Sequence, residues 1–133
     1  MLNDGISPKT GAQLLQKPTV DEMFRNQIPQ LPDFARQLIP ASKKWMTNPI
    51  PDLHPAHNGE QQGFGLSFML TGSATGRSAG SAYWAGLSNC FWWCDRQKGI
   101  AGMVTSQIFP FADMNVIGLW AGIEIAVNGE LAP

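Results

Sequence analysis

Residues 88–104 read Ser88-Asn89-Cys90-Phe91-Trp92-Trp93-Cys94-Asp95-Arg96-Gln97-Lys98-Gly99-Ile100-Ala101-Gly102-Met103-Val104. Two apolar runs flank a polar link at 95–99, and the link ends in a glycine that tolerates a positive φ. Apolar runs joined by a polar link of this length are typical of a β-hairpin. We therefore expect antiparallel strands at about 80–94 and 100–108.

The aromatic cluster at 91–93 has two interpretations, a packed core or a ligand site. Successive strand residues point to opposite faces, so Trp92 lies on one face while Phe91 and Trp93 lie on the other. Core packing is the commoner use of such rings. The cluster predicts a sheet covered on both faces and implies a layer of structure that this chain lacks.

Cys90 and Cys94 are the two cysteines of the chain. Four strand steps of roughly 3.3 Å separate them by about 13 Å, whereas a disulfide requires Cα atoms within roughly 7 Å. We interpret both as buried small hydrophobic residues rather than as a disulfide or metal site. His54 and His57 have no partner ligand at zinc spacing and are interpreted as part of a solvated loop. We expect no metal and no cofactor.

Upstream, large apolar residues occupy every second position of residues 63–70, which predicts one strand at about 63–70. The next segment reads Gly72-Ser73-Ala74-Thr75-Gly76-Arg77-Ser78. It resembles a phosphate loop, but it has three residues between its glycines and Arg in place of Lys. We expect a flexible connection between strands there.

Two helices are expected. In the first, Thr19 and Glu22 form a capping box for a helix at about 19–27. In the second, Asp113 caps a helix at about 114–127, which Asn128-Gly129 ends. Glu124 is the only charge in that second helix, so we expect it to be buried on most sides. Gly118 and Gly122 predict a smooth stripe on which a sheet packs.

The two halves of the chain differ in composition. Residues 1–62 contain eight of the ten prolines, and each proline fixes φ and removes an N–H donor. We expect a single partial domain over 1–133, in which 1–62 is a helix and a Pro-rich wrapping loop. Residues 63–133 then hold the sheet strands and the C-terminal helix. The fold class is α+β.

Composition narrows the function classes. Charged residues make up 14% of the 133 residues and the formal net charge is -1, which argues against a nucleic-acid surface. No apolar run reaches the roughly 20 residues of a membrane span, and the first residues do not read as a signal peptide. We expect a cytoplasmic protein. The low charge content favours cover by a protein partner or by self-association.

The segment Gly80-Ser81-Ala82-Tyr83-Trp84-Ala85-Gly86-Leu87 joins a glycine-rich loop to a strand. Small residues at a strand edge let a ligand approach the backbone closely. Backbone N–H groups aimed outward there can stabilise an oxyanion. The alternative is that the small residues at the start of this strand have only a structural role.

Four segments together resemble one family in order and content. They are Gly63-Phe64-Gly65-Leu66-Ser67-Phe68, Gly80-X-X-X-Trp84-Ala85-Gly86, Phe91-Trp92-Trp93-Cys94-Asp95-Arg96-Gln97-Lys98-Gly99 and Ser106-Gln107-Ile108-Phe109-Pro110-Phe111-Ala112-Asp113. The chain resembles the C-terminal third of serine hydrolases related to class C β-lactamases and penicillin-binding proteins. Within them it is most similar to fungal esterases and acyltransferases of secondary metabolism, of the lovastatin-pathway type.

The resemblance implies a partial β-lactamase/transpeptidase-like fold and acyl transfer through a serine ester, with a small ester or acyl compound as substrate. It implies that Trp84-Ala85-Gly86 is the third catalytic motif. Backbone N–H groups of Gly86 and Leu87 are then the candidate oxyanion donors, and Tyr83 and Trp84 are candidate substrate-pocket residues.

The sequence departs from that family in two motifs. None of its eight serines has a lysine three residues on, and its sole tyrosine belongs to the third motif. Nucleophile and base are therefore missing, and we expect no catalysis by this chain alone. One hypothesis is a fragment of an acyl-hydrolase or acyltransferase, with Met1 either a true start or a gene-modelling artefact. The alternative is a non-catalytic interaction module, and catalysis by His54 or His57 is a third, weaker one.

Overall fold

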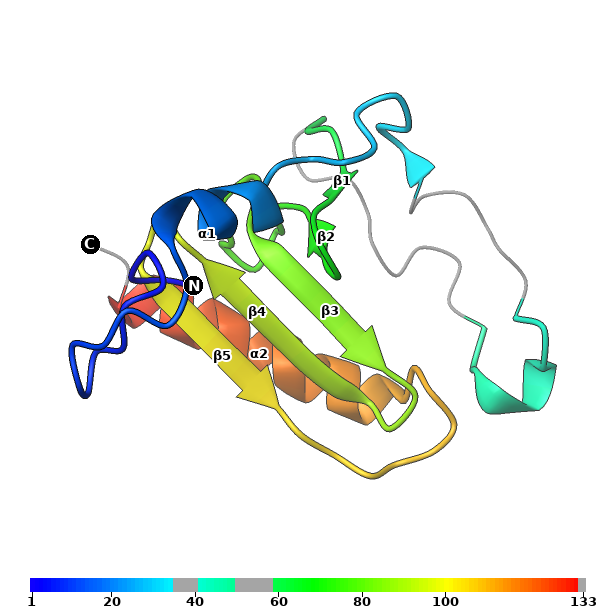
Figure 1. The fold of residues 1–133 in the computed structure, drawn as a ribbon. Coiled ribbons are helices and arrows are strands. Elements are labelled where there is room, and N and C mark those ends of the chain that lie inside the picture. Colours follow the sequence, from blue (N-terminus) through cyan, green and yellow to red (C-terminus); the bar gives the residue numbers. More distant parts are fainter. Residues whose placement is uncertain (35–40, 50–58, 132–133) are drawn as a thin grey trace.

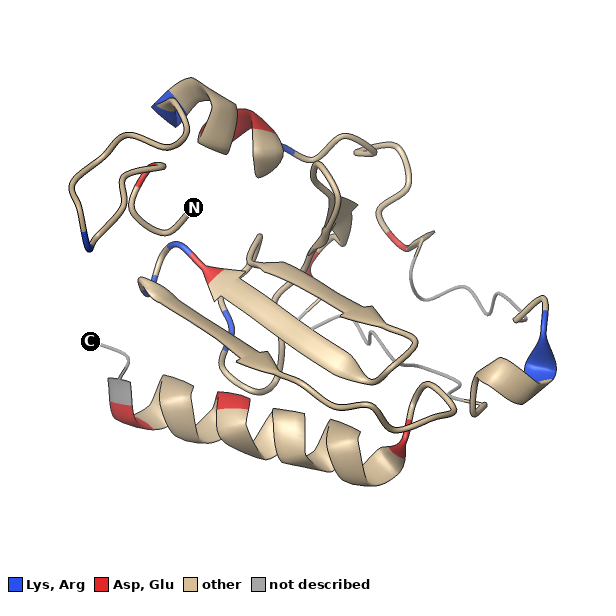
Figure 2. Ribbon diagram, turned by 60° about the horizontal axis from the view of Figure 1, so that its bottom comes forward, with Lys and Arg blue, Asp and Glu red and all other residues tan. Residues whose placement is uncertain are grey.

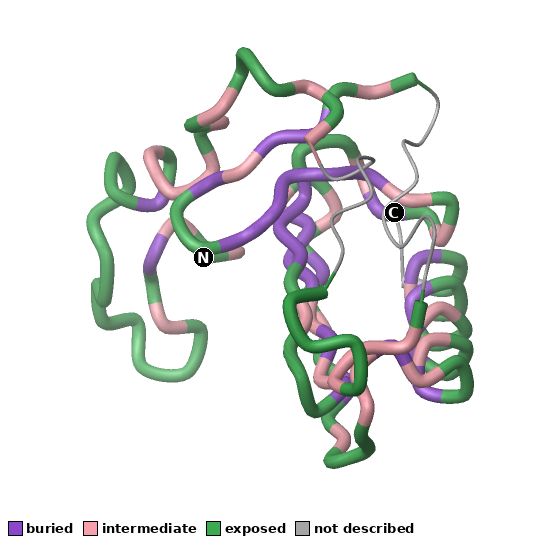
Figure 3. Tube along the Cα trace, turned by 90° about the vertical axis from the view of Figure 1, so that its right-hand side faces the viewer, coloured by how far each residue is buried: buried purple, intermediate pink, exposed green. Residues whose placement is uncertain are grey.

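The computed structural model describes residues 1–34, 41–49 and 59–131. Its centre is an antiparallel sheet with the strands in chain order: β1 (Gly63–Phe64), β2 (Met69–Leu70), β3 (Ala82–Gly86), β4 (Cys90–Asp95) and β5 (Ile100–Val104) (Figure 1). Helix α2 (Met114–Leu131) lies along one face, and the N-terminal segment with α1 (Lys17–Met23) lies on the other (Figure 3). The expected α+β architecture is confirmed. The strand expected at about 80–94 is two strands, β3 and β4, because a turn closed by the hydrogen bond from the Asn89 N–H to the Gly86 carbonyl separates them.

The two faces of β4 contribute to two separate cores. Phe91 and Trp93 face α2, where the Phe91 ring stacks on Trp120 with 4.9 Å between centroids. Trp92 and Cys94 face the opposite side and pack near Phe68. The predicted alternation of 91–93 between two covered faces is confirmed, and the hairpin of β4 and β5 places Asp95 opposite Ile100.

Residues 63–70 form two short strands where one was expected. β1 and β2 pair with each other around a turn in which Ser67 has a φ of 82°. A Cβ on Gly65 would collide with the carbonyl oxygen of Met23 at the end of α1. The alternating large residues thus belong to a tight hairpin that packs against α1. Leu66 lies in the turn of this hairpin and is 42% exposed.

Helix α1 begins at Lys17 and not at the predicted Thr19 cap. Pro18 lies in the first turn, where its fixed φ suits a helix and its missing N–H has no helical partner to lose. No side chain caps this helix, so the predicted capping box is wrong. Glu22 instead forms an ion pair with Arg25, with 2.6 Å between Oε1 and Nη2.

Arg96, in the β4–β5 turn, fastens the N-terminal part of the chain to the sheet. Its guanidinium lies 2.7 Å from the Asp4 carboxylate and 3.1 Å from that of Asp21, and it stacks over the Phe24 ring at 5.1 Å. These contacts hold α1 over the hairpin end of β4 and β5.

Helix α2 starts as predicted, because the Asp113 carboxylate accepts hydrogen bonds from the N–H groups of Asn115 and Val116, each at 3.0 Å. It continues past Asn128-Gly129 to Leu131, beyond its expected end. None of the helices in the described part of the chain combines the length and hydrophobicity that a membrane crossing requires.

The orientation of α2 differs from the prediction. Its buried residues recur every fourth position, at Val116, Trp120, Glu124 and Asn128. The expected glycine stripe is wrong, since Gly118 and Gly122 lie on the exposed side with open space around them. The expectation of burial on most sides is also wrong for this chain, because large apolar residues of the outer face are exposed: Met114, Leu119, Ile123 and Ile125.

The loop between β2 and β3 is anchored, contrary to the flexible connection that we expected. The Arg77 guanidinium lies 2.9 Å from the Glu124 carboxylate of α2, and both side chains are almost fully buried. Thr75 donates a hydrogen bond to the same carboxylate at 2.6 Å. This buried ion pair explains why the one charge of the sequence-predicted helix faces inward.

Candidate active-site edge

The segment Trp84-Ala85-Gly86 forms the second half of β3. The first half, Ala82 and Tyr83, pairs with β2 on one side and β4 on the other. Trp84 to Gly86 pair with β4 alone, because β2 does not extend alongside them. In the described part of the chain, this half of β3 therefore has one unpaired edge, although β3 as a whole is the central strand of the sheet.

Asn89 organises the turn that follows the motif. It is fully buried and has a φ of 56°, a conformation that asparagine tolerates better than most residues. Its N–H donates to the Gly86 carbonyl at 2.9 Å. Its side-chain amide donates to the carbonyls of Ile108 and Pro110 at 2.9 and 2.8 Å and accepts from the N–H of Asp113 at 3.0 Å.

Asn89 thereby joins the β3–β4 turn to the loop that leads from β5 into α2. We did not single out this residue from the sequence. The signal was present, because asparagine between two apolar runs is a common turn residue. Its bonding partners lie 19 to 24 residues away, however, and local patterns do not reveal them.

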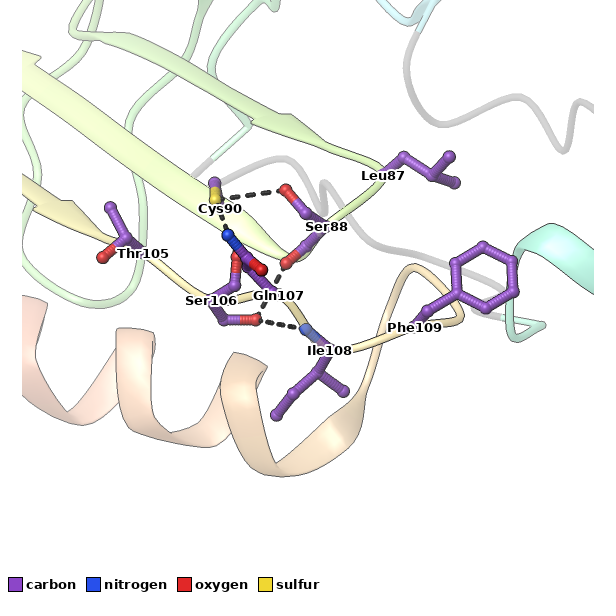
Figure 4. Close-up of a pocket in the computed structure, with 8 residues that line it drawn as sticks. All are labelled: Leu87, Ser88, Cys90, Thr105, Ser106, Gln107, Ile108 and Phe109. Atoms are coloured by element: carbon purple, nitrogen blue, oxygen red, sulfur yellow. Dashed lines mark hydrogen bonds between the residues drawn. The ribbon is translucent and has the colours of Figure 1, made fainter.

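An open pocket of about 590 Å³ lies between that turn and that loop (Figure 4). The Ser106 hydroxyl shapes it: this hydroxyl donates to the Ser88 carbonyl at 2.8 Å and accepts from the Ile108 N–H at 3.1 Å. The residues that line the pocket are Leu87, Ser88, Cys90, Thr105, Ser106, Gln107, Ile108 and Phe109. None of these is His, Lys, Asp or Glu, so the described lining residues give the pocket serines no general base of these types.

The pocket end of the sheet is also poor in charge. Figure 2 shows charged residues at the β4–β5 turn, which holds Asp95, Arg96 and Lys98, whereas the β3–β4 turn carries none. Asp113 is the nearby acid, and its carboxylate is used in capping α2. None of the residues that line the pocket is charged, so an incoming negative charge would meet their backbone dipoles and hydroxyls.

The two cysteines differ in environment. Both are free thiols, Cys94 buried and Cys90 partly exposed in the pocket. A hydrogen bond with the Ser88 hydroxyl holds the pKa of Cys90 below its usual range. The Cys90 thiol also lies 3.3 Å from the Ser106 carbonyl oxygen. Burial raises the pKa of Cys94. The prediction of two buried cysteines therefore holds for Cys94, while Cys90 faces the pocket.

Tyr83 and Trp84 lie on opposite faces of β3. The Tyr83 ring is fully buried, stacks on Trp120 at 5.2 Å, and has the Arg77 guanidinium 4.8 Å above it. Burial raises the pKa of its hydroxyl. Trp84 is 42% exposed and touches the Phe64 ring edge at 5.4 Å between centroids. Of the two predicted pocket residues, Trp84 is the accessible one.

The remaining sequence candidates lie elsewhere. His54 and His57 fall outside the described residues. Within the described ranges, no three acidic, cysteine or histidine side chains gather as a metal site would require. Residues 41–49 come back to the site from the Pro-rich segment: Asn48 donates through its N–H to the Phe111 carbonyl at 2.9 Å, and the Trp45 ring lies 5.8 Å from that of Phe109.

Among the comparisons with known proteins, the one with solved structures gives matches. No protein-family model and no curated protein sequence matches the chain. Its structure is similar to simvastatin synthase (LovD) from Aspergillus terreus in the unliganded form, with a TM-score of 0.67 and 25% sequence identity over 89% of this chain and 30% of that one. The selenomethionyl derivative gives a TM-score of 0.68 at 25% identity, over 90% and 30%.

The chain thus spans about a third of the length of the solved structures that it matches. The match covers nine-tenths of this chain. The resemblance indicated by the sequence motifs is confirmed: this chain has the fold of one part of a β-lactamase-related acyltransferase.

Proposed function

We propose that this chain supplies one part of an acyl-transfer site in a β-lactamase-related acyltransferase or hydrolase. Its contribution is the third motif, Trp84-Ala85-Gly86, with a backbone N–H that stabilises the oxyanion of the acyl intermediate. The observation that carries the proposal is the open edge of β3 beside a pocket, in a chain similar to part of simvastatin synthase. The substrate class is a small ester or acyl compound.

Of the two candidate donors, Leu87 suits the role better than Gly86. The Gly86 carbonyl is bonded within the turn, on the side of β4. Because N–H and C=O groups of successive strand residues alternate between the two edges, the next N–H is directed to the open edge. No hydrogen bond of the Leu87 N–H occurs among those that the described residues form outside strands and helices.

We further propose that the chain, a single partial domain over 1–133, does not catalyse acyl transfer alone. Serine needs an adjacent base to become a nucleophile at neutral pH. The serines of the pocket, Ser88 and Ser106, have a thiol, carbonyls and an N–H as their partners. A lone oxyanion donor has no acyl-enzyme to stabilise.

The test is a chimera in which this chain replaces the matching part of Aspergillus terreus simvastatin synthase. We expect the chimera to retain acyl transfer. Leu87→Pro, which removes the N–H, should lower the rate by roughly 10²–10³-fold, whereas Leu87→Ala keeps the N–H and should leave it nearly unchanged. Equal rates in the two variants, with circular dichroism showing equal folding, would exclude Leu87 as a donor.

The second candidate function is a non-catalytic interaction module. One observation favours it: the outer face of α2 carries four large apolar residues that are 37% to 67% exposed. Exposed apolar area of this kind usually marks a protein contact. A purified chain that sediments as a monomer at all concentrations would argue against this function.

A further inference from the structure

The turn between β3 and β4 carries the Leu87 N–H, the proposed oxyanion donor. The Gly86 carbonyl closes this turn by accepting a hydrogen bond from the Asn89 N–H at 2.9 Å. The carbonyl of Gly86 and the N–H of Leu87 belong to one peptide unit, which is planar and trans, so the two groups point in opposite directions. The bond from Asn89 therefore sets the direction of the Leu87 N–H as well.

Asn89 is itself held by residues outside the turn. Its side chain is fully buried, and both ends of its amide are used. The nitrogen donates to the Ile108 and Pro110 carbonyls at 2.9 and 2.8 Å, and the oxygen accepts from the Asp113 N–H at 3.0 Å. Because Asp113 also caps α2, these three bonds connect the turn to the first residues of that helix.

The presence of asparagine at position 89 supports this connection. The backbone φ of 56° lies in the left-handed region, which glycine adopts most readily and asparagine tolerates. A turn that needed only this conformation could use glycine. Asparagine provides the same backbone conformation and adds three side-chain hydrogen bonds, which are costly to lose at a buried position. The residue therefore does more than close the turn.

The Ser106 hydroxyl forms a second link between the turn and the same loop. It donates to the Ser88 carbonyl at 2.8 Å, and that carbonyl belongs to the peptide unit between Ser88 and Asn89. The peptide unit of the donor, between Gly86 and Leu87, is the one bonded to the Asn89 N–H. The two links thus act on different peptide units, and Asn89 fixes the one that carries the donor.

We propose that Asn89 is a positioning residue for acyl transfer, because it fixes the peptide unit that directs the Leu87 N–H toward the oxyanion. This inference rests on the proposed function, in which that N–H is the donor. A donor stabilises the oxyanion only if it is preorganised toward the place where negative charge develops. This charge is present in the transition state and absent from the bound substrate, so loss of the positioning should lower kcat and leave KM nearly unchanged.

NMR relaxation of the Leu87 amide in this chain tests the positioning without reference to activity. An order parameter of about 0.85 denotes rigid backbone, and one below about 0.6 denotes flexible backbone. We expect the rigid value in the unaltered chain and the flexible value in Asn89→Gly, which keeps the turn conformation but removes the three side-chain bonds. A flexible Leu87 in the unaltered chain, or an unchanged order parameter in Asn89→Gly, would overturn the proposal.

The matched control is Val20→Ala, which opens a cavity at a fully buried position of α1 and so lowers stability without touching the turn. Its Leu87 amide should keep the rigid value. If Val20→Ala loosens Leu87 as much as Asn89→Gly does, the effect is a general loss of stability and the proposal is wrong.

The kinetic test uses the chimera with simvastatin synthase. Asn89→Gly should lower kcat by roughly 10–100-fold, the upper figure being that of a group misplaced by about 1 Å, whereas Val20→Ala should leave kcat nearly unchanged. In a Leu87→Pro background the donor N–H is already absent, so Asn89→Gly should then have little further effect. Effects of the two substitutions that simply multiply would show that Asn89 does not act through Leu87, against the proposal.

Separate outcomes distinguish this inference from the proposed function. Equal rates for Leu87→Pro and Leu87→Ala would remove the donor on which both rest. A slow Leu87→Pro variant, together with an Asn89→Gly variant of unaltered kcat, would leave the proposed function in place and exclude the role of Asn89 alone.

Discussion

Strands β3 and β4 run side by side for five residue pairs, yet their two ends have different roles. At one end, Tyr83 and the buried pair of Arg77 and Glu124 are closed in by α2 and by neighbouring strands. At the other end, Trp84 to Gly86 pair with β4 alone among the described strands, and Leu87 lines a pocket. One end of the β3–β4 hairpin is thus closed by packing and a buried ion pair, and the other end is accessible. The candidate oxyanion donor lies at the accessible end.

The largest expected effect comes from breaking the ion pair at the closed end. Arg77→Met leaves the Glu124 carboxylate buried without its cation, which should cost about 3–5 kcal/mol of unfolding free energy. The double variant Arg77→Met with Glu124→Leu should recover much of that loss. Urea unfolding measures both, and a single variant as stable as the unaltered chain would show that the pair is unimportant to the closed end.

Tyr83 and Trp84 are neighbours in β3, and their replacement should have different effects on stability in its closed and open halves. Tyr83→Ala removes a fully buried ring and should cost about 3–5 kcal/mol. Trp84→Ala removes a half-exposed ring with one edge contact and should cost about 1 kcal/mol. Thermal and urea unfolding provide the measurement. Equal losses at the two positions would contradict the division of β3 into a closed and an open half.

Asn89 is the exception at the open end, a buried residue that holds the pocket loops together. Asn89→Ala removes three side-chain hydrogen bonds and leaves a positive φ, so we expect a loss of about 2–4 kcal/mol. Asn89→Gly restores the backbone freedom and should recover about 1 kcal/mol of it. If alanine and glycine behave identically in urea unfolding, the positive φ is not a source of the loss.

The closed end should also respond to acid through Asp95. Burial favours its protonated form, but hydrogen bonds from the N–H groups of Ser78, Lys98 and Gln97 outweigh burial and lower the pKa of this carboxyl. A lowered folded-state pKa gives stability that is present above the unfolded value near 3.8 and is lost as pH falls through the folded value.

The matched variant is Asp95→Asn, which cannot titrate. Its deficit in unfolding free energy relative to the unaltered chain should be constant near neutral pH and should shrink below about pH 4. Urea unfolding at a series of pH values measures the difference. A deficit that does not change with pH would show that Asp95 contributes no acid-sensitive stability.

The sequence was most informative where contacts are local. The apolar runs around 95–99 predicted the β4–β5 hairpin, and Asp113 predicted the start of α2, because both depend on neighbours within a few residues. The hairpin at 63–70 imitated a single strand, since its turn preserves the alternation of Phe64, Leu66 and Phe68. The helical face of α2 was misjudged because Glu124 is paired with Arg77, 47 residues earlier.

The candidate site was predicted only in part, because some of its features depend on contacts between residues far apart in the chain. The motif Trp84-Ala85-Gly86 is a contiguous string and could be recognised in the sequence. Its open edge depends on β2 starting only at Met69, opposite Tyr83, and its pocket depends on Asn89 bonding to residues 108–113. Neither feature can be predicted from the string alone. Tyr83 is buried because it packs on Trp120 of α2, and this contact between residues far apart in the chain could not be predicted from the motif.

We propose that the chain holds an oxyanion donor without a serine that can be acylated. Intact-mass spectrometry after incubation with a p-nitrophenyl ester tests it, with Cys90→Ala used to remove background thiol acylation. We predict no mass increase by one acyl group and no burst of p-nitrophenol. A stoichiometric acyl adduct located on any serine would contradict the account.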